Sequence, residues 1–184
     1  MSRREVRLAG TGGQGLILAG LILAEAALSE GHHTVQTQAY GPQSRGGASK
    51  AEVIIDLQEI DYPHVAHPGV VLAMSQEACD LYHGDLDPAG VLVADTTFVH
   101  RLPEVPQRLV AEPITRRVLQ EVGRAIVANI SALGLVVALT GVVSRESLTR
   151  AVRERAPHGT VELNLAALKL GFRLAEGKEP VAWS

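Results

Sequence analysis

The sequence is poor in cysteine and in aromatic residues. Cys79 is the only cysteine, which excludes an intramolecular disulfide, a four-thiolate zinc site and an iron–sulfur cluster held by this chain alone. We expect Cys79 to be a small buried hydrophobe. Aromatic residues make up only 3% of the chain, so it lacks the platforms on which single-stranded nucleic acids stack.

The chain also lacks a strong excess of one charge and a long hydrophobic segment. Its net charge of -3 and pI near 6.2 give no overall attraction to nucleic acid. The run LILAGLILAEAAL, which starts at Leu16, contains Glu25 and is shorter than the roughly 20 apolar residues that span a bilayer. With 46% hydrophobic and 20% charged residues, residues 1–184 are predicted to form one globular domain, in a soluble cytoplasmic protein without nucleic-acid or membrane partners.

Apolar residues recur with two different spacings along the first two thirds of the chain, one typical of strands and the other typical of helices. Short β-type runs occupy residues 5–9, 32–38, 48–56, 68–74, 90–97 and 108–114. Helical patterns follow the first run as far as Ser29, begin again after a capping Ser75, and dominate from Thr115 onward, with Ser144 as a further cap. The expected fold is α/β, a Rossmann-like three-layer α/β/α domain with a mainly parallel sheet, closed by C-terminal helices.

One expected helix, residues 124–140, is apolar or small nearly all round, with Asn129 and Ser131 as its clear polar exceptions. Such a helix must be covered on every side. In a chain of 184 residues, we expect another subunit to supply part of the cover. Gly134 within this helix fits either close helix packing or a tolerated helix glycine.

The glycine segment GTGGQG, residues 10–15, lies between the first expected strand and the first expected helix. Glycine lets backbone N–H groups at a helix N-terminus approach an anion closely. The GxGxxG pattern of dinucleotide-binding proteins also needs an acid at the end of the second strand, where this chain has Gln36, Thr37 and Gln38, while Glu30 precedes that strand. NAD binding is therefore disfavoured, no GK[ST] follows to make a P-loop, and a tight turn without a ligand is the alternative.

A second glycine-rich segment, AYGPQSRGGASK, precedes the third expected strand. Because ends of neighbouring parallel strands share one edge, we expect it to meet residues 10–15 there. Arg45 and Lys50 would supply positive charge, and Gly46 and Gly47 would present free N–H groups to a phosphate. A solvated surface loop is the alternative interpretation.

No catalytic or metal site is expected. The sequence contains no GxSxG nucleophile motif, and no Ser, His and acid set stands out by position. His64 and His67 have a spacing compatible with two metal ligands, but Pro63 and Pro68 beside them favour a loop.

The motifs together resemble a known family. GTGGQG at 10–15, AYGPQSRGGASKAEVIID at 39–56, NISALG at 129–134 and TGVVSRESLTRAV at 140–152 look like the γ subunit of the 2-oxoacid:ferredoxin oxidoreductases. The resemblance covers nearly the whole chain in order. The GPQSRGGAS segment is more similar to the 2-oxoglutarate or branched-chain type than to the pyruvate type.

The resemblance implies a subunit, inactive alone, of a complex that oxidatively decarboxylates a 2-oxoacid, forms acyl-coenzyme A and reduces ferredoxin. It places thiamine diphosphate, Mg and [4Fe–4S] clusters on partner subunits, and it names thiamine-binding α and β subunits and ferredoxin as partners. It leaves open a ferredoxin-like δ subunit, and a homodimer when the chain is isolated.

Both the residues and the resemblance indicate coenzyme A as the ligand, because its phosphates are anions that glycine N–H groups and an arginine can hold. The residues expected to line a shared coenzyme A site are Gly10, Thr11, Gly12, Gly13, Gln14, Gly15, Tyr40, Gly41, Ser44, Arg45, Gly46 and Gly47. The same loop is alternatively a docking surface for the partner subunits. A stand-alone nucleotide- or phosphate-binding α/β module is the alternative for the whole chain.

Overall fold

A single mixed sheet organises the chain. The structure is a computed structural model that describes residues 3–40, 48–104, 108–181 and 183. The strands are β1 (Arg4–Thr11), β2 (His33–Tyr40), β3 (Ala48–Asp56), β4 (Val70–Ala73), β5 (Val91–Asp95) and β6 (Arg108–Glu112), in the spatial order β2-β3-β1-β4-β5-β6. These strands match the six runs expected from the sequence.

The sheet is mainly parallel, with one antiparallel exception. β1, β4, β5 and β6 pair in parallel, whereas β3 runs antiparallel to both β1 and β2. β2 and β3 therefore form a hairpin rather than a pair of parallel strands joined by a crossover helix. The hairpin places the end of β2 and the start of β3 at the carboxyl end of β1, where Thr11 lies opposite Ala48.

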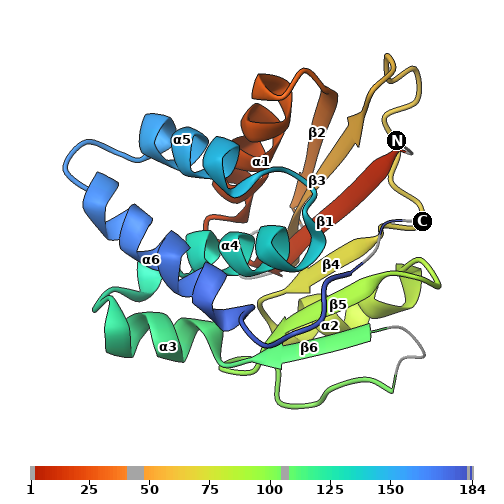
Figure 1. Cartoon of the computed structure of the whole chain (residues 1–184). Coiled ribbons are helices and arrows are strands. Elements are labelled where there is room, and N and C mark those ends of the chain that lie inside the picture. Colours follow the sequence, from red (N-terminus) through yellow and green to blue (C-terminus); the bar gives the residue numbers. More distant parts are fainter. Residues whose placement is uncertain (1–2, 41–47, 105–107, 182, 184) are drawn as a thin grey trace.

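Helices cover the two faces of the sheet unequally (Figure 1). The helices are α1 (Leu16–Ser29), α2 (Gln76–Tyr82), α3 (Ile114–Glu121), α4 (Ala128–Thr140), α5 (Arg145–Arg155) and α6 (Val161–Leu174), with short 3₁₀ turns η1 (His83–Asp85) and η2 (Ala125–Val127). All of the α-helices except α2 contribute to the large core on one face, and α2 packs on the other face with a smaller apolar cluster. The expected three-layer α/β/α fold is confirmed.

Two helix starts follow the expected capping chemistry. The Ser75 hydroxyl accepts a hydrogen bond from the Ala78 N–H at 3.2 Å, and the Ser144 hydroxyl accepts one from the Ser147 N–H at 3.1 Å. Each bond satisfies one of the free N–H groups of a helix's first turn. Both predicted caps are confirmed.

Helix α4 is the most deeply buried helix of the fold. Every residue of α4 except Ala138 is buried, and the helix contacts α1, α3, α5, α6 and β4. The cover comes from this chain's own elements, so the expectation that another subunit supplies part of it is wrong. The apolar pattern of this helix indicated that it must be covered, but not which elements would cover it. In the fold, four other helices reach α4 from one side of the sheet.

Two glycines allow α4 and α6 to cross closely. A Cβ at Gly171 would lie 2.1 Å from the Ser131 carbonyl oxygen, and a Cβ at Gly134 would lie 2.9 Å from the Leu168 carbonyl oxygen. Backbone atoms cannot move aside as a flexible side chain does. Gly134 therefore serves close helix packing, the first of its two interpretations.

Glu30 links the end of α1 to the start of α5. Its carboxylate accepts a 2.7 Å hydrogen bond from the Ser144 N–H. Burial alone would raise the pKa of this carboxyl, but hydrogen bonds from Ser144 and Ser147 outweigh burial and hold the pKa below its ordinary value of 4.5.

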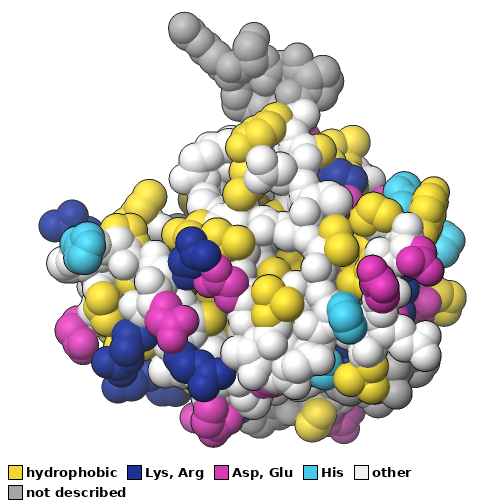
Figure 2. Space-filling model, turned by 90° about the horizontal axis from the view of Figure 1, so that it is seen from above, with side chains coloured by type: hydrophobic (Ala, Val, Ile, Leu, Met, Phe, Trp, Pro, Cys, Tyr) yellow, Lys and Arg dark blue, Asp and Glu magenta, His cyan; other side chains and the backbone are white. Residues whose placement is uncertain are grey.

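In Figure 2, acidic and basic side chains lie interspersed on the visible face. Among the residues that the structure describes, no helix is long and apolar enough to cross a membrane.

Replacing Gly171 by Ala should lower the free energy of unfolding by about 1–3 kcal/mol, because the new methyl group overpacks the α4–α6 contact. Gly84→Ala is the matched control, since a Cβ there meets nothing within 4 Å. Urea denaturation of both variants measures the effect. Equal stability of the two would contradict the close crossing.

Glu30→Gln should destabilise the chain most at neutral pH. A carboxyl whose pKa is lowered in the folded state stabilises the fold above its ordinary pKa of 4.5, and this contribution is lost as the pH falls through the folded-state value. The difference in free energy of unfolding between wild type and variant should therefore shrink below about pH 4.5. Urea titrations at several pH values test this, with the exposed Glu59→Gln as control; a difference that is constant with pH would refute it.

Candidate functional site

The glycine segment forms a tight connection between β1 and α1. Gly13 and Gly15 have positive φ angles of 90° and 75°, a conformation that favours glycine. Gly12 and Gly13 are exposed, and a Cβ on either would meet nothing within 4 Å. Their backbone is therefore open to a ligand, at the start of a helix without a side-chain cap.

Gln14 holds this segment against the sheet. Its Oε1 accepts a 2.7 Å hydrogen bond from the Thr11 N–H, and its Nε2 donates to the Met74 carbonyl oxygen at 2.9 Å. Gly10 provides the space, because a Cβ there would lie 2.2 Å from the Gln14 Oε1. Gln14 thus joins the carboxyl ends of β1 and β4. After these two strands the chain continues toward opposite edges of the sheet, and ligands commonly bind at such a point.

Gly15 contacts the start of helix α4. The Asn129 Nδ2 donates a 2.9 Å hydrogen bond to the Gly15 carbonyl oxygen, and a Cβ on Gly15 would lie 2.6 Å from that nitrogen. The two sequence motifs GTGGQG and NISALG therefore meet in space, although more than a hundred residues separate them.

The second glycine-rich segment starts at the same edge. Tyr40 pairs with Ser49, and Ala48 pairs with Thr11, so the residues that flank this segment lie beside the end of β1. Tyr40 is 69% exposed. The predicted site residues Gly41, Ser44, Arg45, Gly46 and Gly47 lie outside the described residues.

Contrary to expectation, Lys50 does not add positive charge to this edge of the sheet. Its Nζ forms a 2.9 Å ion pair with Glu52 and lies 5.5 Å from the centre of the Tyr82 ring. Glu52 in turn pairs at 2.7 Å with Arg7, which is almost fully buried. The lysine charge is therefore used within the fold, on the face of the sheet that carries α2.

A cavity of about 250 Å³ adjoins the glycine segment. Phe98, Thr115 and Ile126 were missed by the sequence reasoning, and the full lining is Gly13, Gln14, Met74, Phe98, Thr115, Ala125, Ile126 and Ala128. The buried Asp95 at the end of β5 positions this region, since its carboxylate accepts bonds from the Thr97 and Thr115 N–H groups and the Thr115 hydroxyl. The available signal was the position of Asp95, Thr96 and Thr97 at the carboxyl end of the apolar run 90–97.

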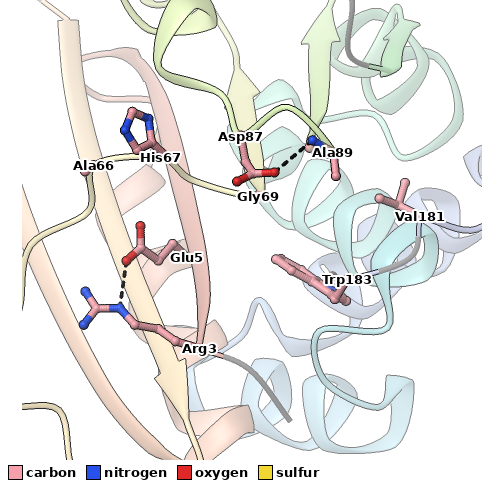
Figure 3. A pocket seen from close by; sticks show the side chains of 10 residues that line it. Arg3, Glu5, Ala66, His67, Gly69, Asp87, Ala89, Val181 and Trp183 are labelled. Carbon is pink, nitrogen blue, oxygen red and sulfur yellow. Dashed lines mark hydrogen bonds and ion pairs between the residues drawn. The ribbon is translucent and has the colours of Figure 1, made fainter.

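A second cavity, of about 290 Å³, lies at the opposite edge of the sheet (Figure 3). Trp183 and His67 face it, but its charged groups are already engaged: Arg3 pairs with Glu5 at 2.7 Å, and Asp87 accepts the Ala89 N–H at 2.8 Å. We therefore place the candidate site at the edge of the sheet where β1 and β4 end and residues 10–15 lie, which we call the glycine edge.

Metal and thiol chemistry receive no support from the described residues. These residues contain no group of three or more His, Cys, Asp or Glu side chains that could hold a metal ion. His64 and His67 lie in the loop that the neighbouring prolines indicated. Cys79 is buried, and burial, aided by Asp80, raises the pKa of its thiol, which keeps it in the unreactive thiol form.

Gln14→Ala should lower the free energy of unfolding by about 1–3 kcal/mol, because it leaves the Thr11 N–H and the Met74 carbonyl without their partner. Hydrogen exchange of the Thr11 N–H should become faster. The exposed Gln58→Ala is the matched control. Unchanged exchange at Thr11 would show that Gln14 does not close the loop.

Sequence comparison extends beyond the motifs. Residues 5–174 match the family described as pyruvate ferredoxin/flavodoxin oxidoreductase. The chain is 45% identical to the 2-oxoglutarate synthase subunit KorC of Methanocaldococcus jannaschii over 95% of both chains. It is 44% identical to the subunit of the same name from Methanothermobacter marburgensis, over 94% of this chain and 96% of that one.

Solved structures agree in fold. The γ subunit of a keto/oxoacid ferredoxin oxidoreductase from Geobacter sulfurreducens superposes with a TM-score of 0.88 at 49% identity, over 95% of this chain and 97% of that chain. A 2-oxoglutarate:ferredoxin oxidoreductase from Magnetococcus marinus shares the fold with a TM-score of 0.85 at 22% identity, over all of this chain and 33% of that one. The chain therefore belongs to the pyruvate ferredoxin/flavodoxin oxidoreductase family, as a γ subunit of the 2-oxoacid:ferredoxin oxidoreductases.

Proposed function

We propose that this chain is the γ subunit of a 2-oxoglutarate:ferredoxin oxidoreductase. The observation that carries the proposal is the 36–45% identity to four KorC subunits of 2-oxoglutarate synthases over nearly the whole chain. Identity is 34–36% to ketoisovalerate oxidoreductase subunits VorA, of which this chain spans only 36%. It is 30% to γ subunits common to pyruvate and ketoisovalerate oxidoreductases.

The proposed complex converts 2-oxoglutarate, coenzyme A and two oxidised ferredoxins into succinyl-coenzyme A, carbon dioxide, a proton and two reduced ferredoxins. Thiamine diphosphate and iron–sulfur clusters supply the decarboxylation and electron-transfer chemistry of this family when bound. The described residues offer no thiolate cluster for iron and sulfur. We accordingly assign thiamine diphosphate, Mg and the [4Fe–4S] clusters to α, β and ferredoxin-like δ partners in the cytoplasm.

The contribution of this chain is to bind coenzyme A at the glycine edge. Gly12 and Gly13 expose their backbone at the uncapped start of α1, where N–H groups and the helix dipole favour an anion. The pyrophosphate of coenzyme A is such an anion. Binding there would steer the thiol toward the acyl group on a neighbouring subunit, a contribution of proximity rather than of acid–base chemistry.

The same edge also suits docking to partner subunits. Phe98 and Ile126 are exposed beside the glycine segment, at 43% and 67%, and apolar side chains of this kind favour protein contacts. Docking and coenzyme A binding are compatible where the ligand lies between two subunits.

Co-expression with the chains encoded beside it tests the main proposal. Purified material should contain companion subunits and should reduce viologen when 2-oxoglutarate and coenzyme A are both supplied. Pyruvate and 2-oxoisovalerate serve as competing substrates. A complex that prefers either of these would overturn the assignment of 2-oxoglutarate. A colourless chain that purifies alone would overturn the proposed assembly with partner subunits.

Arg45→Ala in the assembled complex should raise the KM for coenzyme A about tenfold or more, the loss expected for a charge-assisted hydrogen bond. The KM for 2-oxoglutarate should stay unchanged. Arg150→Ala, an exposed arginine on α5, is the matched control. Failure of the variant to assemble would assign Arg45 to docking, and an intact complex with unchanged coenzyme A kinetics would remove it from both roles.

A further inference from the structure

The two outermost strands of the sheet are β2 and β6. Among the described strands, β2 pairs only with β3, and β6 pairs only with β5. The outer side of such a strand, turned away from its neighbour, presents a row of backbone N–H and C=O groups that can pair with another chain. Folded proteins commonly protect these groups with charged side chains, with proline or by keeping the strand short.

β6 has this protection, and β2 does not. β6 has five residues and begins and ends with the charged Arg108 and Glu112. The C-terminal segment also reaches this strand, where Lys178 pairs with Glu112 at 2.6 Å. β2, residues His33–Tyr40, has eight residues and the sequence HTVQTQAY, which contains no Asp, Glu, Lys, Arg or Pro. At roughly 3.3 Å per residue, β2 offers about 26 Å of strand for pairing.

Helix α1 adds an apolar stripe beside β2. Ile17, Leu21 and Leu28 are spaced by four and seven residues, so they lie on one side of the helix. Ile17 and Leu21 are half-buried, and Leu28 is 55% exposed. The Gln36 Nε2 donates a 3.0 Å hydrogen bond to the Ile17 carbonyl oxygen, which holds the start of this stripe against β2. We call these three apolar side chains the α1 stripe.

The other sides of α1 are already covered within the chain. Glu25 pairs with Arg155 of α5 at 2.7 Å, and the buried residues of α1 belong to the large core. Leu18 also packs against that core, whereas Ile17 and Leu21 do not pack against it among the described residues. The α1 stripe is therefore the part of this helix that is left for a partner.

A second copy of this chain fits this surface by symmetry. A two-fold axis perpendicular to the sheet would place β2 of the two copies side by side in antiparallel order and keep both α1 helices on the same face. Each α1 stripe would then face the other. Because neither β2 nor the α1 stripe contains Asp, Glu, Lys or Arg, such pairing brings no like charges together. Since β6 is protected, the association would stop at two copies.

We propose that the outer side of β2 and the α1 stripe form the interface of a homodimer, in which one sheet continues across both copies. The sequence left a homodimer open without indicating a surface for it. The inference is separate from the proposed function, because it concerns the contact of the chain with its own copy and not with coenzyme A or with other subunits.

Sedimentation velocity of the isolated full-length chain at increasing concentration tests this. The wild type should shift from monomer to dimer. Leu28→Lys on α1 and Gln38→Lys on β2 should each raise the dissociation constant of the dimer about tenfold or more, because each variant brings like charges together across the two-fold axis. Both side chains are exposed, so neither substitution should prevent folding.

The matched controls carry the same substitutions away from the interface. Leu119 on α3 is 55% exposed, as Leu28 is, and Gln58 is exposed like Gln38. Leu119→Lys and Gln58→Lys should keep the wild-type dissociation constant. A wild type that stays monomeric at every concentration would overturn the proposal, and so would a dimer that Leu28→Lys or Gln38→Lys leaves unchanged.

Amide hydrogen exchange of the wild type gives a second test that needs no variant. Exchange in β2 should slow as the protein concentration rises, because its outer N–H groups become hydrogen-bonded in the dimer. Exchange in β6 should not change with concentration. A dimer whose β2 exchange is independent of concentration would form through another surface and would also overturn the proposal.

Discussion

Burial of the apolar helix α4 is the constraint on which the arrangement of the molecule depends. A helix without a polar face must be surrounded, and the fold meets this demand by placing α1, α3, α5 and α6 on one side of the sheet with α4 among them. The glycine pair Gly134 and Gly171 lets α6 approach closely enough to complete the cover. The same packing sets Asn129, at the start of α4, directly against Gly15. The core and the candidate site are thus parts of one arrangement.

Local chemistry made much of this fold predictable. Ser75 and Ser144 indicated the starts of α2 and α5, and the glycine segment indicated a turn between β1 and α1. In each case the determining residues are neighbours in sequence. The prediction of a mainly parallel sheet in three layers rested on the same local alternation. The resemblance to the γ subunits rested on four sequence motifs, and the family match and the relatives confirm it.

The features that were missed depend on pairings between distant residues. The pattern of residue types in a run such as residues 48–56 does not indicate whether the strand will run parallel or antiparallel to its neighbours. The antiparallel direction of β3 could therefore not be inferred from it. Lys50 appeared free in the sequence, whereas Glu52 and the Tyr82 ring engage it in the fold. The lining of the cavity at the glycine edge likewise joins Gly13, Phe98 and Ile126 from three separate connections. Of the predicted site, residues 10–15 and Tyr40 lie at one edge, and the assignment of a ligand to them stays a prediction.

The contact between Arg4 and Trp183 bears on how such a unit can be joined to others. The arginine lies 5.4 Å from the centre of the indole ring, whose N–H donates to the Thr140 carbonyl at 2.7 Å. The two ends of the described chain therefore meet at the start of β1, the opposite end of that strand from the glycine segment (Figure 1). Polypeptide attached at either end would leave from that side. Gene fusion can therefore add neighbouring units at either end without obstructing the candidate site, which suits a fold that makes up about a third of longer proteins that contain it.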